Sequence, residues 1–334
     1  MPKRSPLKPL KNFNYRLVEE KLAGLLINVD RDLQKRGRIA EAARNLEQAR
    51  CLTLLNVIAR FARNQYQAMQ YLVADTPEDP ARNANYALAI APVNRQLLDL
   101  LFSLVYMLDD FQTRSLRYQR AGWREAREEY QKYKTEFSAD QEWQPFFRGF
   151  RKGLGEMALR FGISATEERN PARVPYWPTP TQLKDERTTS RVFLRWLETW
   201  LYGDTSLQAH LSFGGLIMVA PFLVAELVGG EGQQIVEGRM TDQYRFHQFS
   251  RTALVTLAIT TEIDNHCKLG NQVAISYLWT MFCEHVPEGR EMYKQRYESM
   301  LQPVSKEFIH SLVGSCKGKT SLVAARQREH RLEG

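Results

Sequence analysis

Apolar side chains recur at intervals of three and four residues along most of the chain, which is the period of an amphipathic helix. The clearest stripe lies in residues 45–75 and consists of Cys51, Leu55, Ile58, Ala62, Tyr66, Met69 and Val73. Further stretches with helical character are residues 13–35, 82–112, 114–135, 140–161, 182–202, 205–228, 240–265, 271–285 and 288–313. No segment shows the convincing alternation of a half-buried strand. The pattern therefore predicts an all-α fold, a multi-helix bundle in a single domain.

Proline-rich and basic segments mark the limits of this helical pattern. The sequence TPEDP at residues 76–80 ends the long helix of residues 45–75 and turns the chain back. Residues 163–182 hold four prolines, so we expect them to form the longest non-helical connection, either as a functional loop or as a cover. The predicted domain spans residues 13–313, between loose basic tails at residues 1–12 and 314–334.

The composition indicates a soluble protein of a reducing compartment. Hydrophobic residues make up 43% of the 334 and charged residues 25%, which is typical of globular proteins. The four cysteines lack a CxxC pair, and the N-terminus carries no recognisable signal peptide, so we expect a cytoplasmic location. The most apolar stretch, residues 211–229, is interrupted by a proline and a glutamate. Its uninterrupted part is shorter than the ~20 residues a bilayer requires, so we expect a buried core helix and no membrane span.

Positive charge is concentrated at the two ends of the chain. The formal net charge is +8, of which residues 1–12 carry +4 and residues 314–334 carry +3. Only +1 is left for residues 13–313. This distribution favours solvated tails that contact nucleic acid or anionic lipid weakly over a folded nucleic-acid-binding face.

Polar side chains form a narrow stripe in the apolar helix VNRQLLDLLFSLVYMLDDF, residues 93–111. At about 100° per residue, its members fall within roughly 60° around the helix axis. They are Arg95, Asp99, Tyr106 and Asp110. An isolated charge in a protein core is costly, so we expect Arg95 and Asp99 to pair, while Asp110 needs another donor. Two interpretations stay open: an ion pair that fixes helix register, or a pocket for a ligand or for catalysis.

A second polar stripe repeats every four residues in residues 196–213. Its members are Glu198, Tyr202, Ser206 and His210. If this stripe faces Arg95 and Asp99, the two together hold the groups for metal-free acid–base chemistry. His210 would then transfer protons and Arg95 would stabilise an anion. The alternative is that His210 is a core histidine whose hydrogen bonds are satisfied.

Four further residues are of the types that bind zinc, but their spacing argues against a zinc site. They are His266, Cys267, Cys283 and His285. Residues 271–285, between the two pairs, have helical character, and a helix of that length extends about 20 Å. It would hold the pairs too far apart for one ion. We therefore expect neither a metal nor a cofactor.

Three short motifs resemble a bacterial family of helical proteins, the domain of unknown function 5677. They are RQLLD at residues 95–99, YWPTPTQL at residues 176–183 and YGDTSLQAH at residues 202–210. The resemblance covers roughly residues 82–228 and implies a helical fold. The site that it implies consists of Arg95, Asp99, Tyr202, Ser206 and His210. The acid of the family motif is more often Glu, so Asp99 is a departure, and because the family is itself uncharacterised the resemblance implies no activity.

Three functions follow from these observations. The first is a bacterial cytoplasmic protein whose interior pocket binds a small or anionic ligand. Such a protein would act in defence, for example against phage, or in a stress response. The second is a metal-independent RNA-cleaving effector, and the third is a scaffold whose basic tails recruit a partner. The candidate catalytic residues are Arg95, Tyr202, Ser206 and His210. The candidate ligand-binding residues are Arg95, Asp99, Asp110 and Glu198.

Overall fold

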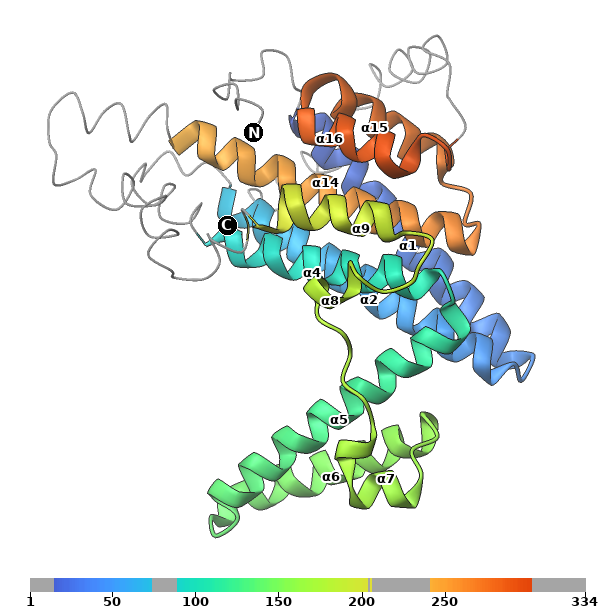
Figure 1. Cartoon of the computed structure of the whole chain (residues 1–334), viewed down its shortest axis with the longest axis vertical. Coiled ribbons are helices and arrows are strands. Elements are labelled where there is room, and N and C mark those ends of the chain that lie inside the picture. Colours follow the sequence, from blue (N-terminus) through green and yellow to red (C-terminus); the bar gives the residue numbers. More distant parts are fainter. Residues whose placement is uncertain (1–14, 74–88, 204, 206–240, 302–334) are drawn as a thin grey trace, which may run out of the picture. The chain divides into compact units, whose positions relative to one another are not determined.

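The computed structural model describes residues 15–73, 89–203, 205 and 241–301, and most of these residues are helical. No strand occurs within these ranges, so the predicted all-α, multi-helix fold is confirmed. The helices are labelled in Figure 1. The chain divides into two compact units, Met1–Leu269 and Gly270–Gly334.

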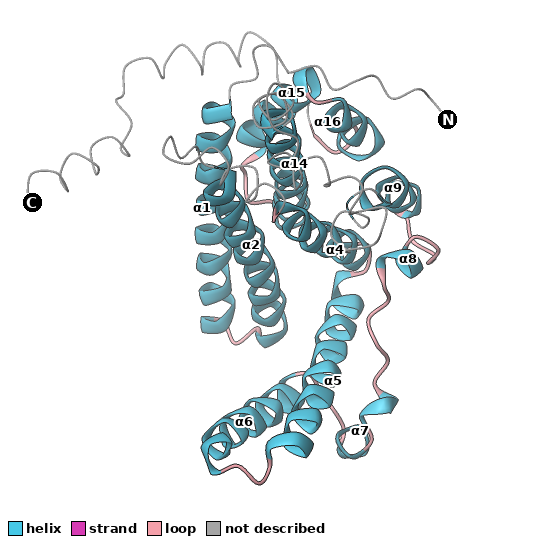
Figure 2. Cartoon of the chain, turned by 90° about the vertical axis from the view of Figure 1, so that its left-hand side faces the viewer, coloured by secondary structure: helices cyan, strands magenta, loops and turns pink. Residues whose placement is uncertain are grey.

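The first two long helices form a hairpin and lie side by side (Figure 2). They are α1 (Tyr15–Ala42) and α2 (Leu46–Val73). Arg44, between them, adopts a left-handed φ of 57°, a conformation that does not continue a helix. The Asn45 side chain then accepts a hydrogen bond from the backbone N–H of Gln48 at 3.1 Å, which caps the start of α2. Most of the stripe predicted for α2 is buried, so this helix is where the periodicity placed it.

The centre of the first unit is α14 (Thr241–Cys267), which packs on α1, α2 and α4 (Ile90–Leu108). Residues 248–264 of α14 are all buried, although many are polar. Asn94 of α4 donates to the Gln248 side chain at 2.6 Å and accepts from the Thr252 hydroxyl at 2.5 Å. Buried polar groups that satisfy one another in this way fix how two helices pair.

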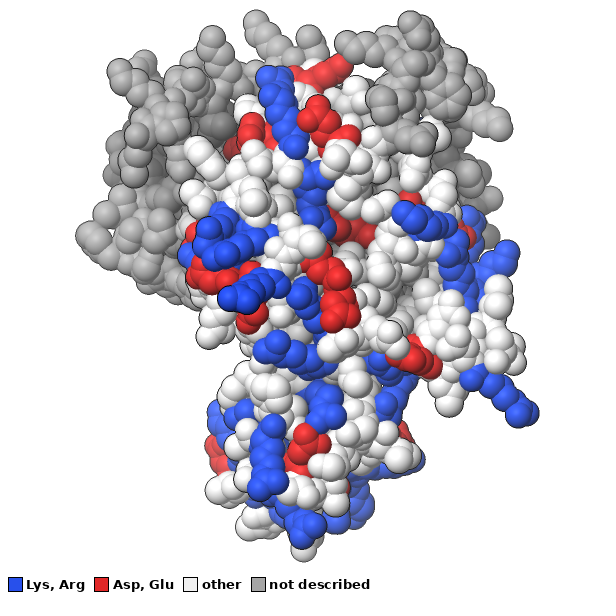
Figure 3. Space-filling model, turned by 45° about the vertical axis from the view of Figure 1, so that its right-hand side comes forward, with Lys and Arg blue, Asp and Glu red and all other residues white. Residues whose placement is uncertain are grey.

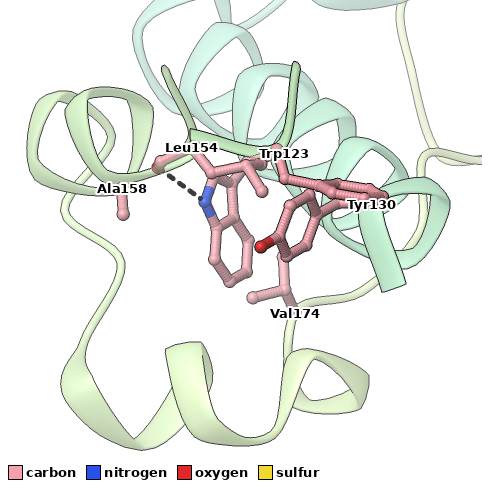
Figure 4. Close-up of a cluster of buried hydrophobic side chains, with 6 residues drawn as sticks. Trp123, Tyr130, Leu154, Ala158 and Val174 are labelled. Atoms are coloured by element: carbon pink, nitrogen blue, oxygen red, sulfur yellow. Dashed lines mark hydrogen bonds between the residues drawn. The ribbon is translucent and has the colours of Figure 1, made fainter. Parts of the chain in front are cut away.

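Residues 111–173, hereafter the arm, form a helical substructure with its own hydrophobic core (Figure 4). The arm contains α5 (Phe111–Phe137), η1 (Gln141–Trp143), α6 (Gln144–Arg160), α7 (Ala165–Arg169) and η2 (Pro171–Arg173). The buried residues of the core are Trp123, Tyr130, Phe147, Leu154 and Ala158 of the arm, together with Val174 directly after it. The indole N–H of Trp123 donates to the Leu154 carbonyl at 3.1 Å, which joins α5 to α6. The arm therefore has packing of its own, apart from the packing around α14.

Residues 174–179, hereafter the strap, run without helical structure from the arm to α8 (Pro180–Leu183). The Arg124 guanidinium of α5 donates to the Val174 carbonyl at 2.7 Å, and the Tyr176 hydroxyl donates to Glu128 at 2.7 Å. The prediction of one long non-helical connection over residues 163–182 was wrong in part, because α7, η2 and α8 are short helices within it. The remaining extended part packs as a cover, which was one of the two expectations.

The helix predicted over residues 182–202 is interrupted. The structure has α9 (Arg191–Leu197), which continues into the π-helical turn η3 (Glu198–Tyr202), whereas residues 184–190 form turns. Asp109, at the end of α4, accepts hydrogen bonds from the hydroxyls of Thr189 and Ser190 at 2.8 and 2.9 Å. These bonds hold the turn in place of a continuous helix.

The second unit contains α15 (Gln272–His285), α16 (Pro287–Met292) and the π-helical turn η5 (Tyr293–Tyr297). The buried ring of Trp279 lies 4.6 Å from the ring of Tyr297, measured between centroids. The helix predicted over residues 271–285 is confirmed, and the one predicted over 288–313 is described only as far as residue 301.

Within the described ranges, no helix is both long and apolar enough to cross a membrane. The apolar stretch at residues 211–229, the predicted helix at 205–228 and the two basic tails lie outside the described residues, apart from Thr205.

Candidate ligand-binding site

Three of the predicted site residues meet where α4 contacts η3. Arg95 donates from Nε to Asp99 Oδ2 at 3.2 Å, which confirms the predicted pairing. The guanidinium carbon of Arg95 also lies 3.5 Å from the centroid of the Tyr202 ring, a cation–π contact. The Phe102 ring also contacts the Tyr202 ring, edge to face, with 5.4 Å between the centroids. Residues from the two polar stripes are thus in direct contact.

The Arg95 and Asp99 side chains differ in exposure. Arg95 is 18% exposed and Asp99 is 42% exposed, so the cation is largely covered and the Asp99 side chain reaches solvent in part, although its Oδ1 is buried. No acceptor in the described part of the chain bonds to the buried Nη1 of Arg95.

Asp110 does not belong to this group, and its place in the predicted stripe was wrong. α4 ends at Leu108, and Asp110 has the non-helical φ of −146° that precedes α5. From Asp99 to the end of α4 the helix rises about 13 Å, which separates the two carboxylates. Its neighbour Asp109, left outside the stripe by the helical projection, is the carboxylate with partners: Thr189, Ser190 and, at 3.9 Å, Arg114.

Glu198 forms an ion pair with Lys184 of the turn after α8, at 3.0 Å between Nζ and Oε1. It is the first residue of η3, and the backbone N–H of Gly203 bonds to its carbonyl oxygen five residues back. This wider turn changes the four-residue spacing on which the second stripe was based. Ser206 and His210, the other two members, lie outside the described residues.

A groove of about 880 Å³ lies beside the Arg95–Asp99 pair, and Asp99 forms part of its wall. It is hereafter the groove. Its walls come from α2, α4, α5, the C-terminal end of α6 and the strap with Pro180. The apolar and aromatic lining residues are Leu54, Val57, Ile58, Phe61, Leu100, Tyr118, Met157, Phe161, Trp177, Pro178 and Pro180. The charged lining residues are Arg50, Asp99, Glu125 and Arg160.

Aromatic rings hold the strap wall of the groove. The indole N–H of Trp177 donates to the Ser103 hydroxyl of α4 at 3.0 Å. The Trp177 ring also makes edge-to-face contacts with Tyr118 at 4.9 Å and with Tyr106 at 5.6 Å. Burial, together with the charge of Glu125, raises the pKa of the Tyr118 hydroxyl, which therefore stays neutral. Tyr106, predicted to lie on the polar stripe, thus packs against the strap.

Glu125 is the second carboxylate of the groove. Burial raises its pKa, Glu128 adds to that effect, and Arg124 opposes it. Sequence reasoning missed Glu125 and Tyr118, although Tyr118, Gly122 and Glu125 are spaced as one face of α5. It singled out the YWPTPTQL segment, which contributes Trp177, as a family-like motif within a functional loop or cover, but it assigned no ligand-binding residue there.

A second pocket, of about 660 Å³, contains Cys51, His266 and Cys267 in its wall. Burial raises the pKa of Cys267 to about 11 and lowers the pKa of His266, so both are neutral near pH 7. Burial also raises the pKa of Cys283, in the second unit, to about 11. A protonated thiol is a poor metal ligand. In the ranges that the structure describes, no group of three or more His, Cys, Asp or Glu side chains could hold a metal ion.

No family model, no curated protein and no solved structure matches this chain. The resemblance to the domain of unknown function 5677 therefore rests on the three motifs alone and stays a prediction.

Proposed function

We propose that this protein binds a small molecule in the groove. The observation that carries the proposal is the groove itself, whose volume of about 880 Å³ and mainly apolar lining are those of small-molecule sites. Such sites combine apolar walls with a few polar groups that orient the ligand. In this groove the polar groups are the carboxylates of Asp99 and Glu125, the hydroxyl of Ser103 and the side-chain amide of Gln96.

The Arg95–Asp99 pair supports the pocket interpretation more than the register interpretation. An ion pair four residues apart on one helix contributes only about 0.3–0.5 kcal/mol, and Asp99 is half exposed. Two contacts with the Tyr202 ring join α4 to η3: the stacking of Arg95 and the edge-to-face packing of Phe102. The pair therefore fixes the Asp99 carboxylate at the groove wall, and Tyr202 fixes Arg95 behind it.

The biological setting proposed for this binding is that of a bacterial cytoplasmic factor of defence or stress response. The bacterial origin rests on the resemblance and the cytoplasmic location on the cysteine usage, whereas the role in defence or stress response is a proposal without a contact behind it. The RNA-cleaving alternative depends on His210 and the scaffold alternative on the basic tails. Since these residues lie outside the described ranges, no described contact favours either alternative over ligand binding.

Filling the groove tests the proposal. Gly122 lines the groove, and a Cβ built on it meets no atom within 4 Å, so a larger side chain has room to enter. The probe is N-phenylnaphthylamine, a neutral dye that fluoresces in apolar sites, titrated into the full-length protein. We expect Gly122→Phe to weaken dye binding about tenfold, a loss of about 1.4 kcal/mol.

The matched control is Gly24→Phe. Gly24 is an exposed glycine of α1, outside the groove, with equally open space at its Cβ. Circular dichroism establishes that both variants are folded. If the dye binds wild type, Gly122→Phe and Gly24→Phe equally, or binds none of them, the groove is not a ligand site.

A further inference from the structure

Ser103 is the most buried polar residue in the lining of the groove. It lies on α4 with 9% of its surface exposed, and its hydroxyl oxygen accepts the hydrogen bond from the Trp177 indole at 3.0 Å. A serine hydroxyl also carries a hydrogen that it can donate. Among the described residues, no acceptor receives that hydrogen. The donor side of Ser103 is therefore available to a molecule in the groove.

Two side-chain amides of the groove also present donors. The amide oxygen of Gln96 accepts from Gln65 at 3.0 Å, and the amide oxygen of Gln119 accepts from the Arg50 guanidinium. The NH2 groups of both amides remain as donors, and neither bonds to an acceptor in the part of the chain that the structure describes. Gln96 and Ser103 lie about two helical turns apart on one face of α4. The uncharged polar groups of this wall therefore offer donors.

The charged side chains of the groove select neither a cation nor an anion. Two arginines and two carboxylates line it, so their charges balance. Asp99 is paired with Arg95 at 3.2 Å, whereas Glu125 and Arg160 are exposed to water. A charged ligand would lose hydration on entering the apolar walls. An uncharged ligand avoids that loss.

A molecule that fills the groove around Ser103 must replace water at its hydroxyl. A ligand that shields the hydroxyl hydrogen without accepting it leaves a buried donor unpaired, which weakens binding. The neighbouring walls are apolar and aromatic: Leu100 lies one turn earlier on α4, and Trp177 meets Tyr118 edge to face at 4.9 Å. This lining fits an acceptor oxygen that is carried on an apolar body.

We infer that the ligand of the groove is an uncharged organic carbonyl compound. Its carbonyl oxygen accepts the hydrogen bond from Ser103, and its apolar or aromatic body packs against Trp177 and Tyr118. The inference rests on the proposed function and adds the chemical class of the ligand to it. It also makes Ser103 a residue that determines specificity.

Three competitors with nearly the same body test the inference. Benzylacetone carries a ketone, butylbenzene has a methylene group in place of the carbonyl, and phenylpropionate has a charged oxygen in place of the ketone's methyl group. Each is used to displace N-phenylnaphthylamine from the full-length protein, which gives its inhibition constant. We expect the inhibition constant of phenylpropionate to be about ten times that of benzylacetone, because the anion loses hydration without gaining a matching cation.

The hydrogen bond is tested with Ser103→Ala. The ratio of the inhibition constants of benzylacetone and butylbenzene should rise about fivefold in this variant, because only the ketone loses a donor. Trp177→Phe is the matched control, since it removes the indole donor and leaves the Ser103 hydroxyl in place. This control should keep the wild-type ratio even if it binds both competitors less tightly.

Failure of the inference and failure of the proposed function give different results. A ratio that is the same in wild type and Ser103→Ala, or that rises equally in Trp177→Phe, overturns the inference and leaves groove binding intact. Phenylpropionate that competes as well as benzylacetone also overturns it. Dye binding that is insensitive to Gly122→Phe, or absent, overturns the proposed function and the inference with it.

Discussion

Asp30 is a buried carboxylate that joins α1 to α2 through several hydrogen bonds. It lies on α1 with 7% of its surface exposed and accepts hydrogen bonds from α2: Asn56 at 2.7 Å, Arg60 at 2.8 Å and Arg63 at 2.9 Å. Gln34, one turn further on α1, adds a fourth at 2.8 Å. Burial alone raises the pKa of Asp30, but the hydrogen bonds and the charge of Arg60 outweigh it and lower the pKa to about 2.

Asp30→Asn is expected to destabilise the protein by about 1.5–3 kcal/mol at neutral pH, because hydrogen bonds to a charged group are lost. The folded pKa of Asp30 is depressed, so its contribution is complete above the ordinary value of 3.8 and is lost as the pH falls toward about 2. Urea unfolding at several pH values measures the difference between wild type and variant, which should shrink across that window.

Asp32→Asn is the control for this prediction. Asp32 lies on the same helix, and its ion-pair partner at 3.8 Å is the exposed Arg31. Its removal should change the free energy of unfolding by less than about 0.5 kcal/mol. An Asp30 variant that behaves like the Asp32 variant would contradict the assigned role of the carboxylate.

Contacts within one helix could be predicted from the sequence, whereas contacts between helices could not. The Arg95–Asp99 pair follows from a four-residue spacing, and it is present. The partners of Asp30 on α2, and the position of Glu125 in the wall of the groove, depend on which segments lie alongside. Helical periodicity predicts which face a residue occupies, but it carries no information about the neighbour across that face.

At the scale of elements, helix ends were less predictable than helix faces. The sequence predicted one helix to residue 112, but α4 stops at Leu108. No glycine or proline marks this end. It is held by Asp109, whose partners Thr189 and Ser190 are about 80 residues away in the chain. When contacts with a distant segment determine where a helix ends, the residues around that end carry little sequence information about it.

The strap depends on Trp177, and a substitution there should loosen the whole segment. Trp177→Ala removes the hydrogen bond to Ser103 and the ring contacts with Tyr106 and Tyr118. We expect a loss of about 2–4 kcal/mol in the free energy of unfolding. Hydrogen exchange should accelerate in residues 174–180, and dye binding should weaken because the groove loses a wall.

Trp200→Ala provides the comparison. Trp200 is 47% exposed in η3 and does not line the groove, so the same substitution removes less buried surface and leaves the strap in place. Equal exchange rates in residues 174–180 of the two variants would show that Trp177 does not anchor the strap.

At the scale of the whole molecule, charge is less even than the net value for residues 13–313 suggests. The arm carries 13 cations and nine acids, a net charge of +4. The other residues between 13 and 313 therefore carry −3, since the whole range has a net charge of +1. Figure 3 shows Lys and Arg side chains over the lower part of the surface, which is the arm. The two tails carry +7 together.

Removing the tails is therefore expected to weaken any contact with polyanions. A chain of residues 13–313 retains a net charge of only +1. Its binding to a labelled single-stranded RNA, measured by fluorescence anisotropy at low salt, should be weaker and less salt-dependent than that of the full chain. Unchanged binding and salt dependence would contradict this prediction and place the RNA contact on the folded part of the chain. The variant to compare would then be Arg148→Glu combined with Arg151→Glu, because both arginines are exposed on α6.

The division into two units predicts that damage to one core stays local. Gly289 lies in α16, where a Cβ would stand 3.0 Å from the Cβ of Phe282 and 3.2 Å from its carbonyl oxygen. Gly289→Ala should therefore cost about 1–3 kcal/mol through overpacking. Hydrogen exchange should accelerate in residues 272–297 and stay unchanged in α1 and α2, which belong to the other unit.

Gly153→Ala in α6 serves as the opposite case. A Cβ there meets nothing within 4 Å, so alanine should stabilise the helix by up to about 1 kcal/mol. If Gly289→Ala instead accelerates exchange in α1 and α2 as much as in α15, the two units unfold together. The second core would then contribute to the stability of the bundle that holds the groove.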